Sequence, residues 1–158
     1  MIGKNEMIRI TAIVCASFCV TCEQQKYTFT DTRDSKVYKT IKIGEQVWLA
    51  QNLSYDANGS KCYDNNSDNC KKYGRLYNWE TAMKSCPNDW HLPSKAEWDV
   101  LTEAALDEFF SPPGGYGYLS GYFYDVGNLS YWWSVSEFDS YIKSLLRSVR
   151  CVKGVLNR

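Results

Sequence analysis

Histidine is almost absent from this sequence of 158 residues, and His91 is the only one. Ser/His/Asp and Cys/His mechanisms both need an imidazole as the base, so either would have to use His91. This residue lies between two predicted helices, where a histidine usually satisfies local backbone groups. We therefore expect no catalytic residue, no cofactor and no enzymatic activity in this chain.

The sequence also lacks an excess of charge of either sign. Its 18 Lys and Arg residues are balanced by 18 Asp and Glu residues. Proteins that bind nucleic acid or an anionic membrane surface usually concentrate positive charge. The composition therefore predicts no nucleic-acid partner, and contact with a membrane only through a lipid anchor.

No apolar run is long enough to span a bilayer, which requires about 20 residues. Lys4 and Arg9 instead precede a shorter uncharged run over residues 10–22, and the composition then becomes polar abruptly. This order of basic, apolar and polar segments is typical of a secretory signal. We predict a signal peptide over residues 1–22 and one domain over residues 23–158.

Cys22 ends the apolar run and is a candidate for lipidation. The three residues before it, Cys19-Val20-Thr21, differ from the usual pattern that precedes a lipidated cysteine. Lipid attachment at Cys22 and simple export therefore both remain open.

Seven cysteines become four once the signal is removed, namely Cys62, Cys70, Cys86 and Cys151. An even number of cysteines in an exported protein predicts disulfide bonds, and four cysteines allow three pairings. The spacings do not form the paired C-x-x-C units of a zinc site, so we expect no metal there.

Two helices and several strands are predicted. Asn78 can cap a helix over residues 78–85, and Pro87 stops it. Ser94 and Glu97 have the spacing of a capping box, which begins a helix over residues 94–106. Strands are expected over residues 37–43, 46–50 and 148–153, with a hairpin turn at Gly44-Glu45 between the first two.

Aromatic residues are abundant, with six Trp and twelve Tyr. Residues 116–124 alternate aromatic and small side chains, which predicts two short strands that turn at Ser120-Gly121, and a further strand is expected at Trp132 and Trp133. Rings beside polar groups are typical of sugar-stacking surfaces. The candidate ligand-binding residues are Tyr122, Tyr124, Trp132 and Trp133. The alternative is that these rings form the core, because about half the side chains of a strand face inward.

Four segments of the sequence match a known family: IGEQVWLAQNLSY, KCYDNNSDNCKKYGRLYNWETAMKSCPNDWHLPSKAEWDVL, YWWSVSE and SVRCVKG. Together they resemble the Fibrobacter succinogenes major paralogous domain, a bacterial cell-surface module, from about Thr28 to Gly154. HLPSKAEWDVL and SVRCVK are also similar, more distantly, to the formylglycine-generating enzyme family. This implies a C-type-lectin-like α+β fold with two short helices and a small irregular antiparallel sheet, stapled by disulfides.

The resemblance also implies how the cysteines pair, Cys62 with Cys70 and Cys86 with Cys151. It does not carry enzyme activity, because Cys151 matches only a structural position of the formylglycine-generating enzymes and their catalytic cysteine pair is not reproduced. Relative to the family, the chain is short between Trp133 and Cys151, where an aromatic strand pair is expected. The polar run 64–68 has the oxygen donors of a calcium loop but lacks its glycine and final glutamate, so we expect a solvated loop closed by a disulfide.

These observations predict an exported, non-enzymatic binding or adhesion module at the bacterial cell surface, outer membrane or outside the cell. Its expected partner is a polysaccharide or another cell-surface component. The alternative is a structural envelope protein without a specific small ligand. An exposed aromatic patch would favour the first function, and full burial of the rings would favour the second.

Overall fold

The computed structural model describes residues 27–101, 111–136 and 144–154. The predicted signal peptide with Cys22 lies outside the described residues, as does the predicted helical segment from residue 102 to residue 106. The described part is a mixed α+β structure with more strand than helix, which confirms the predicted α+β class.

Ten strands, three α-helices and one 3-10 helix lie in the described residues. In chain order they are β1 (Tyr27–Asp31), β2 (Lys36–Ile43), β3 (Gln46–Leu49), β4 (Ser60–Lys61), η1 (Tyr63–Asn65), α1 (Ser67–Tyr73), β5 (Leu76–Tyr77), α2 (Trp79–Ser85), β6 (Trp90–His91), α3 (Lys95–Asp99), β7 (Gly114–Tyr118), β8 (Phe123–Val126), β9 (Leu145–Ser148) and β10 (Val152–Lys153).

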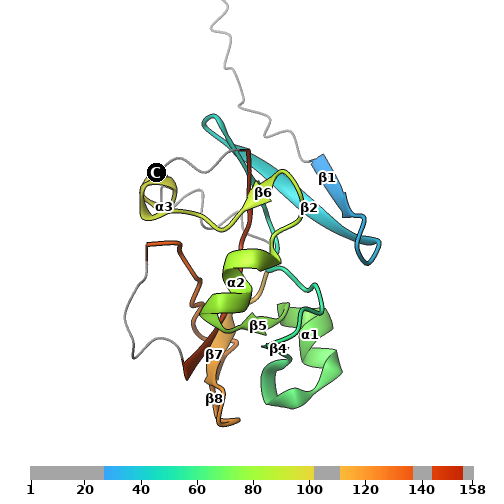
Figure 1. Ribbon diagram of the computed structural model, residues 1–158, viewed down its shortest axis with the longest axis vertical. Helices are drawn as coiled ribbons and strands as arrows, with labels where there is room; N and C mark the ends of the chain where they lie inside the picture. Colours follow the sequence, from blue (N-terminus) through green and yellow to red (C-terminus); the bar gives the residue numbers. More distant parts are fainter. Residues whose placement is uncertain (1–26, 102–110, 137–143, 155–158) are drawn as a thin grey trace, which may run out of the picture.

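The strands form two antiparallel sheets rather than the single small sheet that the resemblance implies. The first has the order β1-β2-β3-β10-β6, and the second has the order β4-β5-β9-β7-β8. Figure 1 shows β1, β2 and β6 in the upper half of the view and β4, β5, β7 and β8 in the lower half, with α2 between them. The end of the described chain supplies one strand to each sheet, β9 and β10, so it joins the two halves.

The first hairpin forms where the sequence predicts it. β2 and β3 pair from Ile43↔Gln46 to Thr40↔Leu49, and Gly44 in the turn has a φ of +58°. A positive φ is easy for glycine because it has no Cβ, so Gly44 suits this position. β1 was not predicted, and it pairs along β2 as the edge strand of the first sheet.

The two predicted helices are present, but one is shorter than expected. α2 is capped by Asn78, whose side chain accepts a hydrogen bond from the Thr81 amide at 2.8 Å. α3 has both hydrogen bonds of the predicted capping box. α3 ends at Asp99, so the predicted extension is wrong over residues 100 and 101. Leu101 still packs against the Trp48 cluster, while Val100 faces solvent.

The polar run 64–68 is exposed and enclosed by the Cys62–Cys70 disulfide, as expected, but it is not a plain loop: it begins in η1 and ends in the first turn of α1. Asn66 caps α1 by accepting a hydrogen bond from the Asp68 amide at 3.0 Å. Cys70 is the only buried residue of this helix, and its disulfide with Cys62 fastens it. The helix was missed because it has no apolar stripe, which is the main signal for a helix in a sequence.

The late strands differ in part from the prediction. β7 and β8 pair around the expected turn. The single strand predicted over residues 148–153 is instead two strands in two different sheets, β9 and β10. The strand predicted at Trp132 and Trp133 is wrong, since Trp132 makes one isolated bridge to Ser148 and Trp133 turns into the core.

Both disulfides implied by the resemblance are present, Cys62–Cys70 and Cys86–Cys151. The second one links the end of α2 to the segment between β9 and β10. Cys151 is fully buried in the largest apolar cluster, and Cys86 packs against that cluster. This bond therefore ties the middle of the chain to its last strands through the core.

Candidate functional site

An aromatic pocket lies between α3 and the segment after β8. Its volume is about 360 Å³, and its lining residues are Lys95, Trp98, Trp132, Ser134 and Ser136. The rings of Trp98 and Trp132 are stacked, with centroids 5.5 Å apart and planes at 28°. Two half-buried indoles thus form an apolar wall beside two serine hydroxyls.

Trp132 is held by a polar contact at its inner edge. Its Nε1 donates to Oδ1 of Asn52 at 2.9 Å, and Nε of Arg150 donates to the same oxygen at 3.1 Å. The Arg150 guanidinium also lies 5.5 Å from the centre of the Trp132 ring. These contacts fix the indole in one orientation. The side chain therefore loses less conformational entropy when a ligand stacks on it.

Arg150 is completely buried, which is unusual for a charged side chain. Burial lowers the pKa of its guanidinium to about 9, so the group remains protonated at neutral pH. Its Nη1 donates to the Leu49 carbonyl at 3.2 Å. A positive charge is therefore held behind the Trp132 ring, where it interacts favourably with the electrons of the indole.

The opposite side of the pocket is joined to the beginning of α3. The Val135 amide donates to the Pro93 carbonyl at 3.0 Å, and the Lys95 amide donates to the Ser136 hydroxyl at 3.3 Å. Trp98 itself packs on Trp48, with ring centroids 4.8 Å apart. Both walls of the pocket are thus attached to the first sheet or to α3 and form a preorganised shape.

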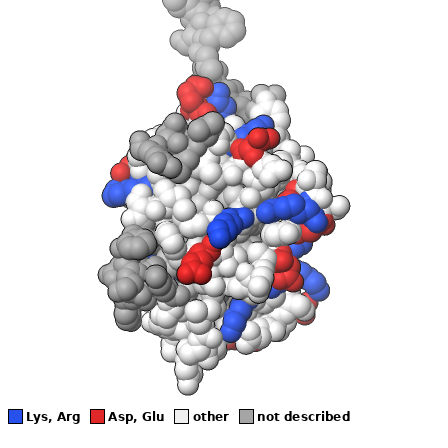
Figure 2. Space-filling model, in the orientation of Figure 1, with Lys and Arg blue, Asp and Glu red and all other residues white. Residues whose placement is uncertain are grey.

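Tyr122 and Tyr124 lie on a different surface, at the β7–β8 hairpin. Tyr122 is 66% exposed and Tyr124 is 44% exposed. Tyr124 stacks on Tyr116 across the hairpin, with ring centroids 5.4 Å apart. Figure 2 shows no charged side chains at the lower tip of this face, where the hairpin lies. The hairpin is therefore a second aromatic surface, separate from the pocket.

Trp133 cannot contact a ligand in this structure. Its side chain is completely buried in the main apolar cluster. Its Nε1 donates to the Tyr77 carbonyl at 2.6 Å. The four residues proposed from the sequence therefore lie in three places. Tyr122 and Tyr124 are on the hairpin, Trp132 lines the pocket and Trp133 is in the core. Trp133 is no longer a candidate for ligand binding.

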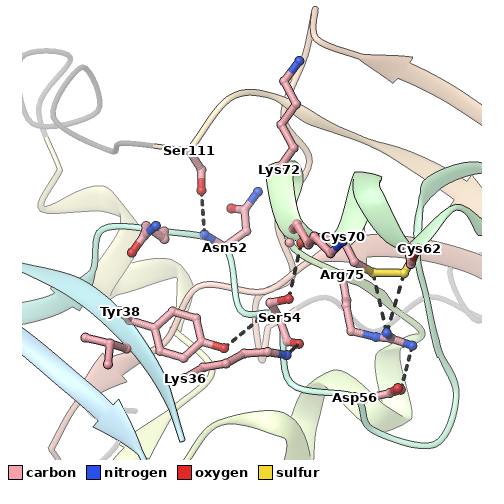
Figure 3. A pocket seen from close by; sticks show the side chains of 15 residues that line it. Lys36, Tyr38, Asn52, Ser54, Asp56, Cys62, Cys70, Lys72, Arg75 and Ser111 are labelled. Carbon is pink, nitrogen blue, oxygen red and sulfur yellow. Dashed lines mark hydrogen bonds and ion pairs between the residues drawn. A yellow bond between two sulfur atoms is a disulfide. The ribbon is translucent and has the colours of Figure 1, made fainter. Parts of the chain in front are cut away.

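A second and larger cleft, of about 460 Å³, lies among β2, α1 and residues 51–56. Figure 3 shows Arg75 beside the Cys62–Cys70 disulfide at one side of this cleft. Arg75 forms an ion pair with Asp56 at 2.7 Å. The lining also includes three lysines, so positive groups outnumber carboxylates among the described residues that line it.

His91 has contacts at both ring nitrogens, to the Gly154 carbonyl through Nδ1 and to the Glu97 carboxylate through Nε2. Neither nitrogen faces a serine hydroxyl or a thiol in these contacts. This arrangement agrees with the expectation that His91 satisfies nearby polar groups of the fold. The absence of enzymatic activity remains a prediction from the sequence.

Two residues of the polar run 64–68 have partners within the chain. Asn66 caps α1 and Asp68 pairs with Lys71 at 2.8 Å. Among the described residues, no three His, Cys, Asp or Glu side chains lie close enough together to hold a metal ion. The part of the chain that the structure describes also has no helix with the length and apolar character needed to cross a membrane.

The sequence did not indicate Trp98, Asn52 or Arg150 as parts of a site. Trp98 lies in the helix predicted over residues 94–106, and an apolar residue on a helix can belong to the core or to a pocket. Asn52 and Arg150 are 98 residues apart and carry no shared motif. No signal in a single sequence brings these two residues together.

The described residues thus define a small, disulfide-bonded α+β domain with a preorganised aromatic pocket. Residues 41–109 match the model of the Fibrobacter succinogenes major domain. This match confirms, over those residues, the family resemblance that the sequence motifs indicated. No curated protein and no solved structure matches the chain.

Proposed function

We propose that this protein is a non-enzymatic module of the bacterial cell surface that binds polysaccharide, with Trp98 and Trp132 as the stacking surface. The observation that carries the proposal is the open pocket of about 360 Å³ beside these two stacked rings. Flat apolar rings flanked by hydroxyl groups suit the alternating apolar faces and polar edges of a sugar chain. The fixed orientation of Trp132 supports the same function, since a preorganised site loses less entropy on binding.

The proposal includes export and a C-type-lectin-like fold. Export is supported by the signal-like segment at residues 1–22, with a lipid at Cys22 as one means of attachment, and by the two disulfides, which persist in oxidising compartments. The fold is supported by the similarity of HLPSKAEWDVL and SVRCVK to the formylglycine-generating enzymes. Tyr122 and Tyr124 offer an additional contact surface for a long chain or for another cell-surface component.

The test is a binding screen of the purified protein against plant and bacterial polysaccharides. We expect Trp132→Ala to weaken binding of the best polysaccharide at least about tenfold, which is about 1.4 kcal/mol. Trp132→Phe keeps an aromatic ring in the pocket but loses the indole N–H and one of the two rings, so it should keep part of the affinity. Tyr122→Ala tests the hairpin surface separately. Tyr27→Ala is the matched control, because it removes an exposed ring from the edge strand β1, which belongs to neither candidate surface.

The alternative outcomes are distinct. Loss of binding in Tyr122→Ala with retention in Trp132→Ala would move the site to the hairpin. No binding of any polysaccharide by the folded wild-type protein would reject the proposal and favour a structural envelope protein. Circular dichroism of each variant separates loss of the site from loss of the fold.

A further inference from the structure

The two disulfides of this protein have different surroundings. Cys86–Cys151 closes a separation of 65 residues, and Cys151 is fully buried. Cys62–Cys70 closes a separation of only 8 residues, and both of its cysteines line the larger cleft. A thiol from solution therefore has an approach to Cys62–Cys70 through the cleft. Cys86 is half-buried, as Cys62 is, but it lines neither this cleft nor the aromatic pocket, and its partner Cys151 is fully buried.

Arg75 contacts both sulfur atoms of the cleft disulfide. Its Nη1 lies 3.6 Å from Sγ of Cys62 and 3.6 Å from Sγ of Cys70 (Figure 3). The side chain is held in this position by its ion pair with Asp56 and by a hydrogen bond from Nε to the Ser60 hydroxyl at 2.8 Å. A guanidinium beside a sulfur stabilises the thiolate more than the neutral thiol, which makes that sulfur a better leaving group.

The cleft also attracts negatively charged reactants. Lys36, Lys71, Lys72 and Arg75 line it. Three of these four cations are paired with carboxylates, Lys36 with Asp34, Lys71 with Asp68 and Arg75 with Asp56, so the cleft keeps an excess of one positive charge. A thiol reacts as its thiolate, so the attacking species carries negative charge, and a carboxylate-bearing thiol carries more. The charge of the cleft therefore favours anionic thiols over cationic ones.

We infer that Cys62–Cys70 is a thiol–disulfide exchange site for small anionic thiols, and that Cys86–Cys151 is a permanent structural bond. The incoming thiolate attacks Sγ of the half-buried Cys62, and the Cys62–Cys70 bond breaks. The electron pair of that bond goes to Cys70, which leaves as a thiolate beside Arg75, and Cys62 is joined to the thiol in a mixed disulfide. A second thiolate of the same class then attacks the sulfur of the attached thiol. The bond to Cys62 breaks, Cys62 leaves as a thiolate that takes up a proton, and the two small thiols depart joined as a disulfide.

The experiment treats the native protein with reduced glutathione, blocks free thiols with iodoacetamide at several times, and locates the modified cysteines by peptide mass mapping. We expect Cys62 and Cys70 to become modified first, a glutathione adduct at Cys62, and an intact Cys86–Cys151 bond. At equal thiolate concentration, the positively charged thiol cysteamine should react more slowly than glutathione. Opening of Cys86–Cys151 first, or of both bonds together, would overturn the inference.

Two variants separate the role of the Arg75 charge from the role of its ion pair. Arg75→Gln and Asp56→Asn both remove the ion pair, but only Arg75→Gln removes the cation beside the sulfurs. We expect Arg75→Gln to slow exchange about tenfold, and Asp56→Asn to leave the rate equal or higher. Equal slowing by both variants would contradict the assigned role of Arg75. The polysaccharide screen does not depend on this site, so the two proposals can fail separately.

Discussion

Nε2 of His91 lies 2.8 Å from Oε1 of Glu97, whose other carboxylate oxygen completes the capping box of α3. Nδ1 of the same imidazole lies 2.9 Å from the carbonyl oxygen of Gly154. A carbonyl can only accept, so Nδ1 carries a proton in this contact. The only histidine of the chain therefore connects β6, the first turn of α3 and the residue after β10.

Removal of the Glu97 carboxylate should destabilise the domain. Glu97 is 3% exposed and accepts hydrogen bonds from the Ser94 amide and the Ser94 hydroxyl. Glu97→Ala leaves the two Ser94 groups without their acceptor and removes the contact with His91, and we expect the free energy of unfolding to fall by about 3 kcal/mol. Urea denaturation measures the change. Glu80→Ala is the control, because this exposed residue of the first turn of α2 should change stability by only about 0.5 kcal/mol.

The two disulfides should contribute unequally to stability. Loop-closure entropy predicts about 4 kcal/mol for the separation of 65 residues between Cys86 and Cys151, and about 2.5 kcal/mol for the separation of 8 residues between Cys62 and Cys70. Replacing both cysteines of each pair by alanine and comparing the denaturation midpoints tests this order. A greater loss from the Cys62–Cys70 pair would contradict it.

Gly115 and Gly127 provide a matched pair of substitutions. Both have positive φ, +65° and +80°. A Cβ at Gly115 would lie 2.2 Å from the Tyr124 carbonyl oxygen and 2.7 Å from the Val126 amide nitrogen, whereas a Cβ at Gly127 has no atom within 4 Å. Gly127→Ala should cost about 1 kcal/mol from backbone strain alone, and Gly115→Ala about 3 kcal/mol or more because β7 and β8 must also separate.

Thermal melting of both glycine variants measures this difference. Similar losses in the two variants would mean that β8 moves aside easily. In that case the close contact between β7 and β8 would not be a constraint on the sequence.

Tyr38 should make stability decrease at high pH. Burial raises the pKa of its hydroxyl to about 12, above the value of 10.0 that an unperturbed tyrosine has. The unfolded chain therefore loses this proton first, and the free energy of unfolding falls as pH rises from 10 toward 12, by about 2.7 kcal/mol in total. Below pH 10 the full contribution is present.

Tyr38→Phe removes this titration and also the hydrogen bond that the Ser54 amide donates to the Tyr38 hydroxyl at 3.1 Å. The variant should be about 1 kcal/mol less stable than the wild type at pH 7. It should become equally stable near pH 11, where the wild type has lost a similar amount. A constant difference between the two proteins from pH 7 to pH 11 would contradict the raised pKa.

Local features of the fold were predictable from the sequence. The Asn78 cap, the Ser94–Glu97 capping box and the Gly44 turn each depend on residues within four positions of one another. Their hydrogen bonds and backbone angles are set before any distant segment is in place. The disulfide pairing was available only from the resemblance to a family, since spacing alone left three pairings open.

The candidate site was predictable only in part. The sequence indicated that exposed aromatic residues would lie late in the chain, and this holds for Tyr122 and Tyr124. It could not separate Trp132 from its neighbour Trp133, although one lines a pocket and the other is fully buried. Two adjacent identical side chains have the same local propensities, so only the packing around them distinguishes their roles.

The sequence by itself determined the helix caps, the first hairpin, the α+β class and the family resemblance over residues 41–109, because these depend on short-range chemistry and on long motifs. The tertiary structure alone decided where α3 ends, that residues 145–153 divide between two sheets, and that Trp98 meets Trp132. Asn52 and Arg150 hold that pocket from opposite parts of the chain. Contacts over such separations follow from burial of the whole core, which no local pattern encodes.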